Sequence, residues 1–267
     1  MHHSGKTGHS GVLPVPLKRE QADGLSVEVY ADRTSMGRAA ALAAAERIRS
    51  LQRTQAGVRM IFAAAPSQNE FLEALAAQPG IDWAGITAFH MDEYIGLPEE
   101  APQRFGRFLS DRLFDIVHPG QVHLLRGNAP PAEECKRYAE LLAERPLDIV
   151  CLGIGENGHL AFNDPPVADF LDPLLVKPVE LEAACRRQQV NDGCFQSLDE
   201  VPAHALTLTI PALLSAAHMY CIVPGQAKRE AVARSLRGPV LPSCPASVLR
   251  RHPDCTLYLD RDSYPFS

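Results

Sequence analysis

The sequence predicts an α/β fold of three layers, in which helices cover both faces of a mostly parallel, Rossmann-like sheet. Two observations lead to this prediction. Short apolar runs rich in valine and isoleucine alternate with helical patterns from residue 25 onward. Polar and glycine-rich stretches follow several of these runs, and in such sheets ligands bind outside the carboxyl ends of the strands.

Each element is expected for a local reason. Short apolar runs with many β-branched residues favour strands, whereas apolar residues repeated every three or four positions favour helices. The expected strands are residues 25–31, 58–65, 85–92, 147–155, 205–210, 219–224 and 255–260. The expected helices are residues 35–52, 70–78, 105–115, 131–144 and 226–238.

One domain is expected over residues 25–267, because no linker and no internal repeat interrupts the alternation. Residues 1–24 are expected to form a flexible tail, which contains histidines but no apolar core of a signal peptide or membrane anchor. Residues 165–195 lack a clear period, and an irregular insertion of this length in a compact domain is typical of a lid.

Composition narrows the classes of partner. The chain has 267 residues, a hydrophobic fraction of 46% and a net charge of −6. These values indicate a globular protein with a small-molecule partner and argue against nucleic acid or an anionic membrane. Seven cysteines without a C-x-x-C pair indicate reduced thiols in a cytoplasmic protein. No metal-ligand spacing occurs, so no metal site is expected.

A pair of carboxylates, Asp92 and Glu93, follows the expected strand that contains "ITAF". A carboxylate at the end of a buried strand can have its pKa shifted by a cleft, and it can then transfer protons. Capping of the following turn is the structural alternative for Asp92.

The stretch "GIGENGHLAFND" follows another buried strand. Its glycines, Gly153 and Gly155, allow the backbone to approach a ligand closely. His159 is the candidate general base, and Asn157 and Asp164 are the polar side chains that would support it. A structural histidine with its hydrogen bonds satisfied is the alternative.

Two further candidates would bind an anion. Ser67, with Glu70 three residues later, is predicted to form a capping box, and a helix N-terminus after a strand also binds phosphate. Lys228 is predicted in the first turn of its helix, where a cation opposes the helix dipole, so a bound anion would compensate it. An exposed surface lysine is the alternative.

Two of these segments resemble the signature segments of the glucosamine-6-phosphate deaminase/isomerase family: "MDEYIGLP" at 91–98 and "LGIGENGHLAFNDP" at 152–165. Three weaker matches follow in the family's order, at 195–216, 223–232 and 245–253. The resemblance covers roughly residues 25–262 and implies the same α/β fold.

The resemblance also implies roles for the catalytic candidates. Asp92 would move a proton between C2 and C1 of the opened sugar phosphate, and His159 would open the pyranose ring. Asn157 stands where many members have aspartate, and Asp164 replaces a glutamate, which shortens that carboxylate by one methylene. An uncompensated shift of about an ångström can cost orders of magnitude in rate.

At the phosphate end the resemblance is weaker. Lys228 matches the family's phosphate-binding lysine and Ser67 falls near its phosphate-loop threonine, but the loop "AAAPSQN" has no glycine. The family's lid arginine falls on Gly193, and Arg186 and Arg187 are the expected substitutes. Loss of that arginine without replacement would weaken phosphate binding by about 1.5–3 kcal/mol.

Together these features predict an enzyme that isomerises and deaminates an amino-sugar phosphate, most simply glucosamine 6-phosphate, without a metal or organic cofactor. Two alternatives stay open. One is a hydrolase similar to 6-phosphogluconolactonase, which shares the fold and a similar "GH" segment. The other is a sugar-phosphate sensor without turnover. "MDEY", "IGLP" and "FND" favour the deaminase, and self-association as a homo-oligomer is left open.

Overall fold

The two central strands are apolar at nearly every position because helices cover both of their faces. In the computed structural model, which describes residues 13–266, every residue of β3 (Val58–Phe62) and β7 (Ile149–Leu152) is buried. The other strands of the main sheet are β1 (Lys18–Ala22), β2 (Leu25–Tyr30), β4 (Ile86–His90), β6 (Gln121–His123), β10 (His218–Val223) and β11 (Cys255–Asp260).

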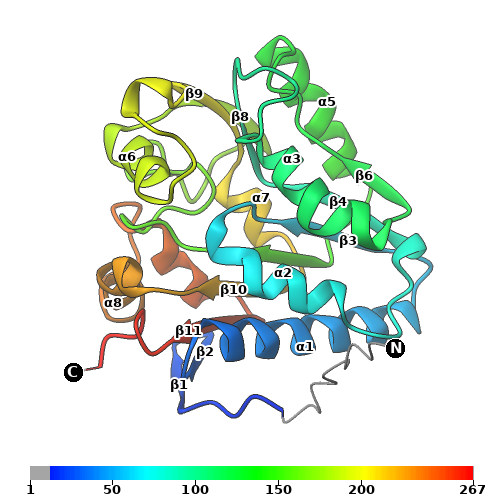
Figure 1. The fold of residues 1–267 in the computed structure, drawn as a ribbon, viewed down its shortest axis with the longest axis vertical. Coiled ribbons are helices and arrows are strands. Elements are labelled where there is room, and N and C mark those ends of the chain that lie inside the picture. The colour runs from blue at the N-terminus through cyan, green and yellow to red at the C-terminus, as the bar shows by residue number, and fades with distance from the viewer. Residues whose placement is uncertain (1–12, 267) are drawn as a thin grey trace, which may run out of the picture.

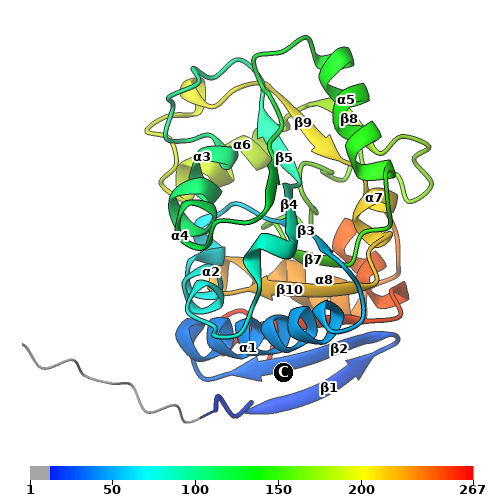
Figure 2. The same ribbon diagram turned by 90° about the vertical axis from the view of Figure 1, so that its right-hand side faces the viewer.

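The main sheet has eight strands in the order β1-β2-β11-β10-β7-β3-β4-β6. β1 runs antiparallel to β2, and the remaining pairs are parallel. Figure 2 shows β1 and β2 together at one edge of the molecule, beside the first helix. The predicted three-layer α/β fold with a mostly parallel sheet is therefore confirmed.

Helices cover both faces of the sheet, and each face has its own apolar cluster (Figure 1). One layer contains α1 (Arg33–Gln52), α2 (Asn69–Ala76), α3 (Phe105–Leu109), a π-helical turn (Ser110–Phe114) and α4 (Asp115–Val117). The opposite layer contains α5 (Pro131–Ala143), α7 (Ile210–Leu214) and α8 (Arg229–Arg237). Short 3₁₀ turns span Pro66–Gln68, Trp83–Gly85, Leu198–Glu200, Gln226–Lys228 and Pro245–Arg251.

A second, smaller sheet lies beyond the carboxyl end of β4. It consists of β5 (Asp92–Tyr94), β9 (His204–Leu208) and β8 (Val176–Glu180), all antiparallel. The strand expected at 205–210 therefore exists, but it belongs to this small sheet and not to the parallel one. Only Met91 separates β4 from β5, so Asp92 stands at the junction of the two sheets.

Two segments are more regular than the sequence suggested. β1 falls within the expected tail 1–24, because an exposed edge strand can be built from charged residues that do not read as a strand. The expected lid, 165–195, contains β8 and the helix α6 (Ala183–Asn191). Residues 1–12 of the expected tail lie outside the described residues. Across the described chain, no helix has the length and apolar character needed to cross a bilayer.

The chain reverses its direction of travel across the sheet between β3 and β7. From β3 it proceeds outward to β4 and β6, and from β7 it proceeds the opposite way to β10 and β11. At such a switch point the loops after the two neighbouring strands diverge and leave a crevice at their carboxyl ends. The loops after β3 and β7 carry Ser67 and His159, so this topology places both residues at the crevice.

Candidate active site

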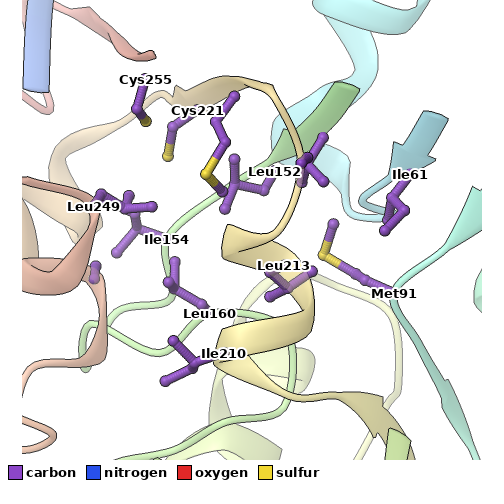
Figure 3. Packing of buried hydrophobic residues seen from close by; sticks show 14 of the residues in the cluster. Ile61, Met91, Leu152, Ile154, Leu160, Ile210, Leu213, Cys221, Leu249 and Cys255 are labelled. Atoms are coloured by element: carbon purple, nitrogen blue, oxygen red, sulfur yellow. The ribbon is translucent and has the colours of Figure 1, made fainter. Parts of the chain in front are cut away.

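Buried apolar neighbours hold the functional loops against the core. Met91, Ile154 and Leu160 are each at most 4% exposed and belong to one apolar cluster (Figure 3). Met91 directly precedes Asp92, and Leu160 directly follows His159. Exposing these buried apolar side chains to water would cost free energy, so the polar residues beside them are fixed in position.

Most of the predicted site residues line one pocket. Its wall comes from the loops after β3 and β7, from the start of β5, from α6 and from the turn before α8. The predicted residues that line it are Ser67, Asp92, Gly153, Gly155, His159 and Lys228. Asn157 and Asp164 do not line this pocket but hydrogen-bond with one another and with His159.

Asp92 and Glu93 separate into different roles. Burial, with a further contribution from the charge of Glu93, raises the pKa of Asp92 well above its ordinary value. Glu93 instead accepts hydrogen bonds from the backbone amides of Phe105 and Gly106, at the start of α3. The capping role considered for Asp92 thus falls to Glu93, and the Asp92 carboxyl is left facing the pocket.

His159 is oriented by a relay of two side chains. Asn157 Nδ2 donates to Asp164 Oδ1 at 2.7 Å, and Asn157 Oδ1 lies 2.8 Å from His159 Nδ1. A carboxylate only accepts hydrogen bonds, so it fixes which end of the amide faces it. The amide oxygen must then accept from Nδ1–H, and the neutral ring keeps a free lone pair on Nε2.

Asp164 remains an anion in this relay. Burial alone would raise the pKa of its carboxyl, but hydrogen bonds and charge from His159, with a hydrogen bond from Asn157, lower it overall. Its Oδ1 also lies 3.2 Å from His159 Nδ1. The carboxylate can therefore stabilise a positive charge on the ring, which an amide at position 157 cannot do by itself.

Gly155 is required by the position of the imidazole. A Cβ atom at this residue would lie 2.1–2.3 Å from three atoms of the His159 ring. The backbone therefore passes directly against the ring, which only glycine permits. Gly153 is less crowded, since its nearest neighbour would be Gln68 Nε2 at 3.1 Å.

The predicted capping box at Ser67 is wrong. Pro66 begins a 3₁₀ turn, so Ala65 is its N-cap and Ser67 lies inside the turn. Ser67 Oγ accepts from Gln68 Nε2, while Glu70 pairs with Arg33. Proline readily starts a helical turn, which explains the shift. The Ser67 residue still lines the pocket.

Lys228 is a buried cation at this pocket. It is only 7% exposed, which rules out the surface-lysine alternative, and burial lowers its pKa. It forms no salt bridge with any described residue, and it is the only lysine or arginine among the described residues of the pocket wall. A buried cation is costly unless an anion pairs with it, so we expect a bound ligand to supply an anionic group here.

Neither of the substitutes expected for the lid arginine lines the pocket. Arg186 donates to the backbone carbonyls of Leu198 and Val201, and Arg187 is exposed. The buried residues Gln188 and Gln189, next along α6, line the pocket instead. The sequence analysis missed these two residues because it looked for a positively charged side chain to bind the phosphate. The sequence signal for them was a pair of adjacent glutamines.

A larger hollow lies elsewhere. It has a volume of about 680 Å³ and lies between α3, α4 and β6, with Arg107 and Arg126 in its wall. It contains none of the residues predicted from the sequence. The pocket at the switch point combines a raised-pKa carboxyl, an oriented imidazole and a buried lysine, and we take it as the candidate active site.

Comparisons with known proteins agree with this architecture. A family model described as glucosamine-6-phosphate isomerases/6-phosphogluconolactonase matches residues 31–169. A glucosamine-6-phosphate deaminase of Listeria monocytogenes is 34% identical over 211 residues, which are 79% of this chain and 88% of the relative. One from an Exiguobacterium species is 38% identical over 184 residues, which are 68% and 70% of the two chains.

Comparisons with solved structures agree with the sequence comparisons. A monomeric glucosamine-6-phosphate deaminase aligns with a TM-score of 0.81 and 30% identity, over 89% of this chain and 98% of that one. A 6-phosphogluconolactonase from Thermotoga maritima aligns with a TM-score of 0.72 over 89% and 100%, but at 19% identity it shows the fold alone. The chain belongs to the family of glucosamine-6-phosphate isomerases and 6-phosphogluconolactonases.

Proposed function

We propose that this protein converts glucosamine 6-phosphate into fructose 6-phosphate and ammonia. The observation that carries the proposal is the pair of proton-transfer groups on one pocket wall, Asp92 with a raised pKa and His159 with a free Nε2. The named relatives at 34–38% identity support the same reaction.

The geometry supports a different proton transfer for each of the two groups, His159 and Asp92. His159 Nε2 takes the proton from the O1 hydroxyl and returns it to O5, which opens the ring. Asp92 then removes the proton from C2 while O1 takes up a proton from solvent, giving an enolamine, and Asp92 delivers a proton to C1 while the amine loses one to solvent. The resulting imine at C2 adds water and releases ammonia. A carboxyl with a raised pKa suits both halves of the C2-to-C1 transfer, since it gains and loses a proton at similar cost.

The phosphate would bind beside Lys228 in the same pocket. Lys228 supplies the charge, and Ser67 and Gln68 supply hydrogen-bonding groups. Gln188 and Gln189 would contribute amides from α6, in place of the guanidinium expected from the sequence. Binding of the phosphate would give Lys228 the partner that no described residue provides.

Ammonia release by the purified protein tests the proposal. Glucosamine 6-phosphate is compared with galactosamine 6-phosphate and with unphosphorylated glucosamine. We expect ammonia and fructose 6-phosphate in equal amounts from the first, and much slower turnover without the phosphate. Absence of ammonia with all three sugars would contradict the proposal.

The shared fold keeps lactone hydrolysis as a second candidate, because the family description includes 6-phosphogluconolactonase. Hydrolysis of 6-phosphogluconolactone in the same preparation distinguishes the two. A sensor without turnover would bind glucosamine 6-phosphate and release no ammonia.

We further propose a cytoplasmic location, which seven free cysteines support. Self-association as a homo-oligomer stays a prediction, and light scattering would test it by measuring the molar mass in solution.

A further inference from the structure

A buried carboxylate oxygen behind the catalytic imidazole has no partner. Asp164 Oδ2 makes no hydrogen bond with any described residue, and the side chain is only 1% exposed. Its other oxygen, Oδ1, accepts from Asn157. A buried anionic oxygen without a donor is costly, so the position favours a ligand that brings positive charge.

Two metal-binding side chains lie around this carboxylate. One nitrogen of His159, one carboxylate oxygen of Asp164 and Cys185 Sγ lie within 4.8 Å of one another, and all three residues are buried. Cys185 belongs to α6, and burial together with the nearby Asp164 carboxylate raises the pKa of its thiol. Nitrogen, oxygen and sulfur at this spacing match the donor set of zinc.

We propose that His159, Asp164 and Cys185 form an inhibitory binding site for Zn²⁺ or a similarly thiophilic divalent cation. The ion displaces the thiol proton of Cys185, which leaves to solvent, and bonds to the thiolate and the carboxylate. Two negative ligands neutralise the double charge of the ion, which a buried site requires. Small movements of α6 bring the three ligands to zinc distances of about 2.0–2.3 Å.

The site acts from behind the imidazole. His159 Nδ1 faces Asp164, whereas neither Asp164 nor Cys185 lines the substrate pocket. A metal on Nδ1 moves the ring proton to Nε2, and Nε2–H can no longer accept a proton from the sugar. The ion therefore stops ring opening while the pocket remains free for substrate. Asn157 Oδ1, 2.8 Å from Nδ1, is placed to serve as a fourth ligand.

Cadmium tests the site directly, because a cadmium–thiolate bond gives an ultraviolet charge-transfer absorption that does not depend on activity. Titration of the full-length protein with Cd²⁺ should give one ion per chain and this absorption. Cys185→Ser should abolish the absorption and weaken Cd²⁺ binding by at least about 10- to 100-fold. The matched control is Cys194→Ser, a more exposed cysteine just beyond the same helix, which should retain both signals.

An absorption that persists in Cys185→Ser, or that the unchanged protein never shows, overturns the proposal. If Cys185→Ser does not fold, Asp164→Asn is measured instead, and it should keep the thiol while weakening Cd²⁺ binding to a similar degree. These measurements stand even if the protein releases no ammonia.

The kinetic arm rests on the proposed function. Zn²⁺ should lower kcat for ammonia release and leave KM for glucosamine 6-phosphate unchanged, and a chelator should restore the rate. A rise in KM with kcat unchanged would place the ion in the pocket and contradict a site behind the ring.

Discussion

The two ends of the pocket differ in how their residues are held. At the proposed proton-transfer end, Asp92 begins β5 and His159 lies in the loop after β7, and each is next to a buried apolar residue. At the proposed phosphate end, the wall comes partly from α6, a helix inside an insertion between β7 and β9. Positions fixed by a strand end could be predicted from local sequence, whereas positions fixed by a helix that packs from a distance could not.

The largest effect should come from the proton-transfer end. Asp92→Asn removes the group that moves the C2 proton, so kcat for ammonia release should fall by about 10²–10⁴-fold. Binding of glucosamine 6-phosphate, measured by calorimetry, should persist because Asn keeps the size of the side chain. Undiminished turnover would remove Asp92 from the mechanism.

Gly155→Ala tests the backbone contact at the same end. The new methyl group would lie 2.1–2.3 Å from the imidazole and must displace it. A misplacement of about an ångström should reduce kcat by roughly 10²-fold. Gly153→Ala is the matched control, where the nearest atom is a flexible amide at 3.1 Å, and it should lose much less activity.

Substitutions at the proposed phosphate end should raise KM more than they lower kcat. Lys228→Gln removes a charged hydrogen bond of about 1.5–3 kcal/mol, which corresponds to roughly a 10- to 100-fold higher KM. Arg187→Gln changes an exposed residue that does not line the pocket, and it should leave KM unchanged. A large KM effect at Arg187 would show that α6 rotates when substrate binds.

Stability should respond to pH in opposite ways at two carboxyls. The raised pKa of Asp92 means that the folded protein favours the protonated form, so stability is lost as pH rises above the ordinary value of 3.8. Asp92→Asn should therefore raise the melting temperature, and by more at pH 8 than at pH 5. The lowered pKa of Asp164 contributes stability that is lost as pH falls through its folded value. A stabilisation by Asp92→Asn that does not grow with pH would contradict this account.

The smallest effect concerns α6 itself. If the helix closes over bound substrate, amide hydrogen exchange across Ala183–Asn191 should slow with glucosamine 6-phosphate present, while exchange in β7 stays the same. Equal exchange in α6 with and without the sugar would show that the helix does not act as a lid.

Particular residues show where sequence reasoning succeeded and where it failed. The alternation of elements predicted the sheet, and strand ends predicted Asp92, His159 and Lys228 as pocket residues. β1 was missed because charged side chains hide an edge strand. Arg186 was misjudged because composition does not reveal where a guanidinium points, and Cys185 was missed because only the packing of α6 brings it beside Asp164.

The bonds of Arg186 also bear on how this protein could be engineered. Its guanidinium ties α6 to the carbonyls of Leu198 and Val201 within the same segment, whereas Gln188 Oε1 accepts from the Glu156 amide outside it. We expect that the segment can be exchanged between relatives, with its joints at β8 and β9, if the buried contacts of Cys185 and Gln188 are kept. A chimaera carrying another relative's segment should acquire that relative's preference for the distal end of the sugar while retaining the same proton-transfer residues.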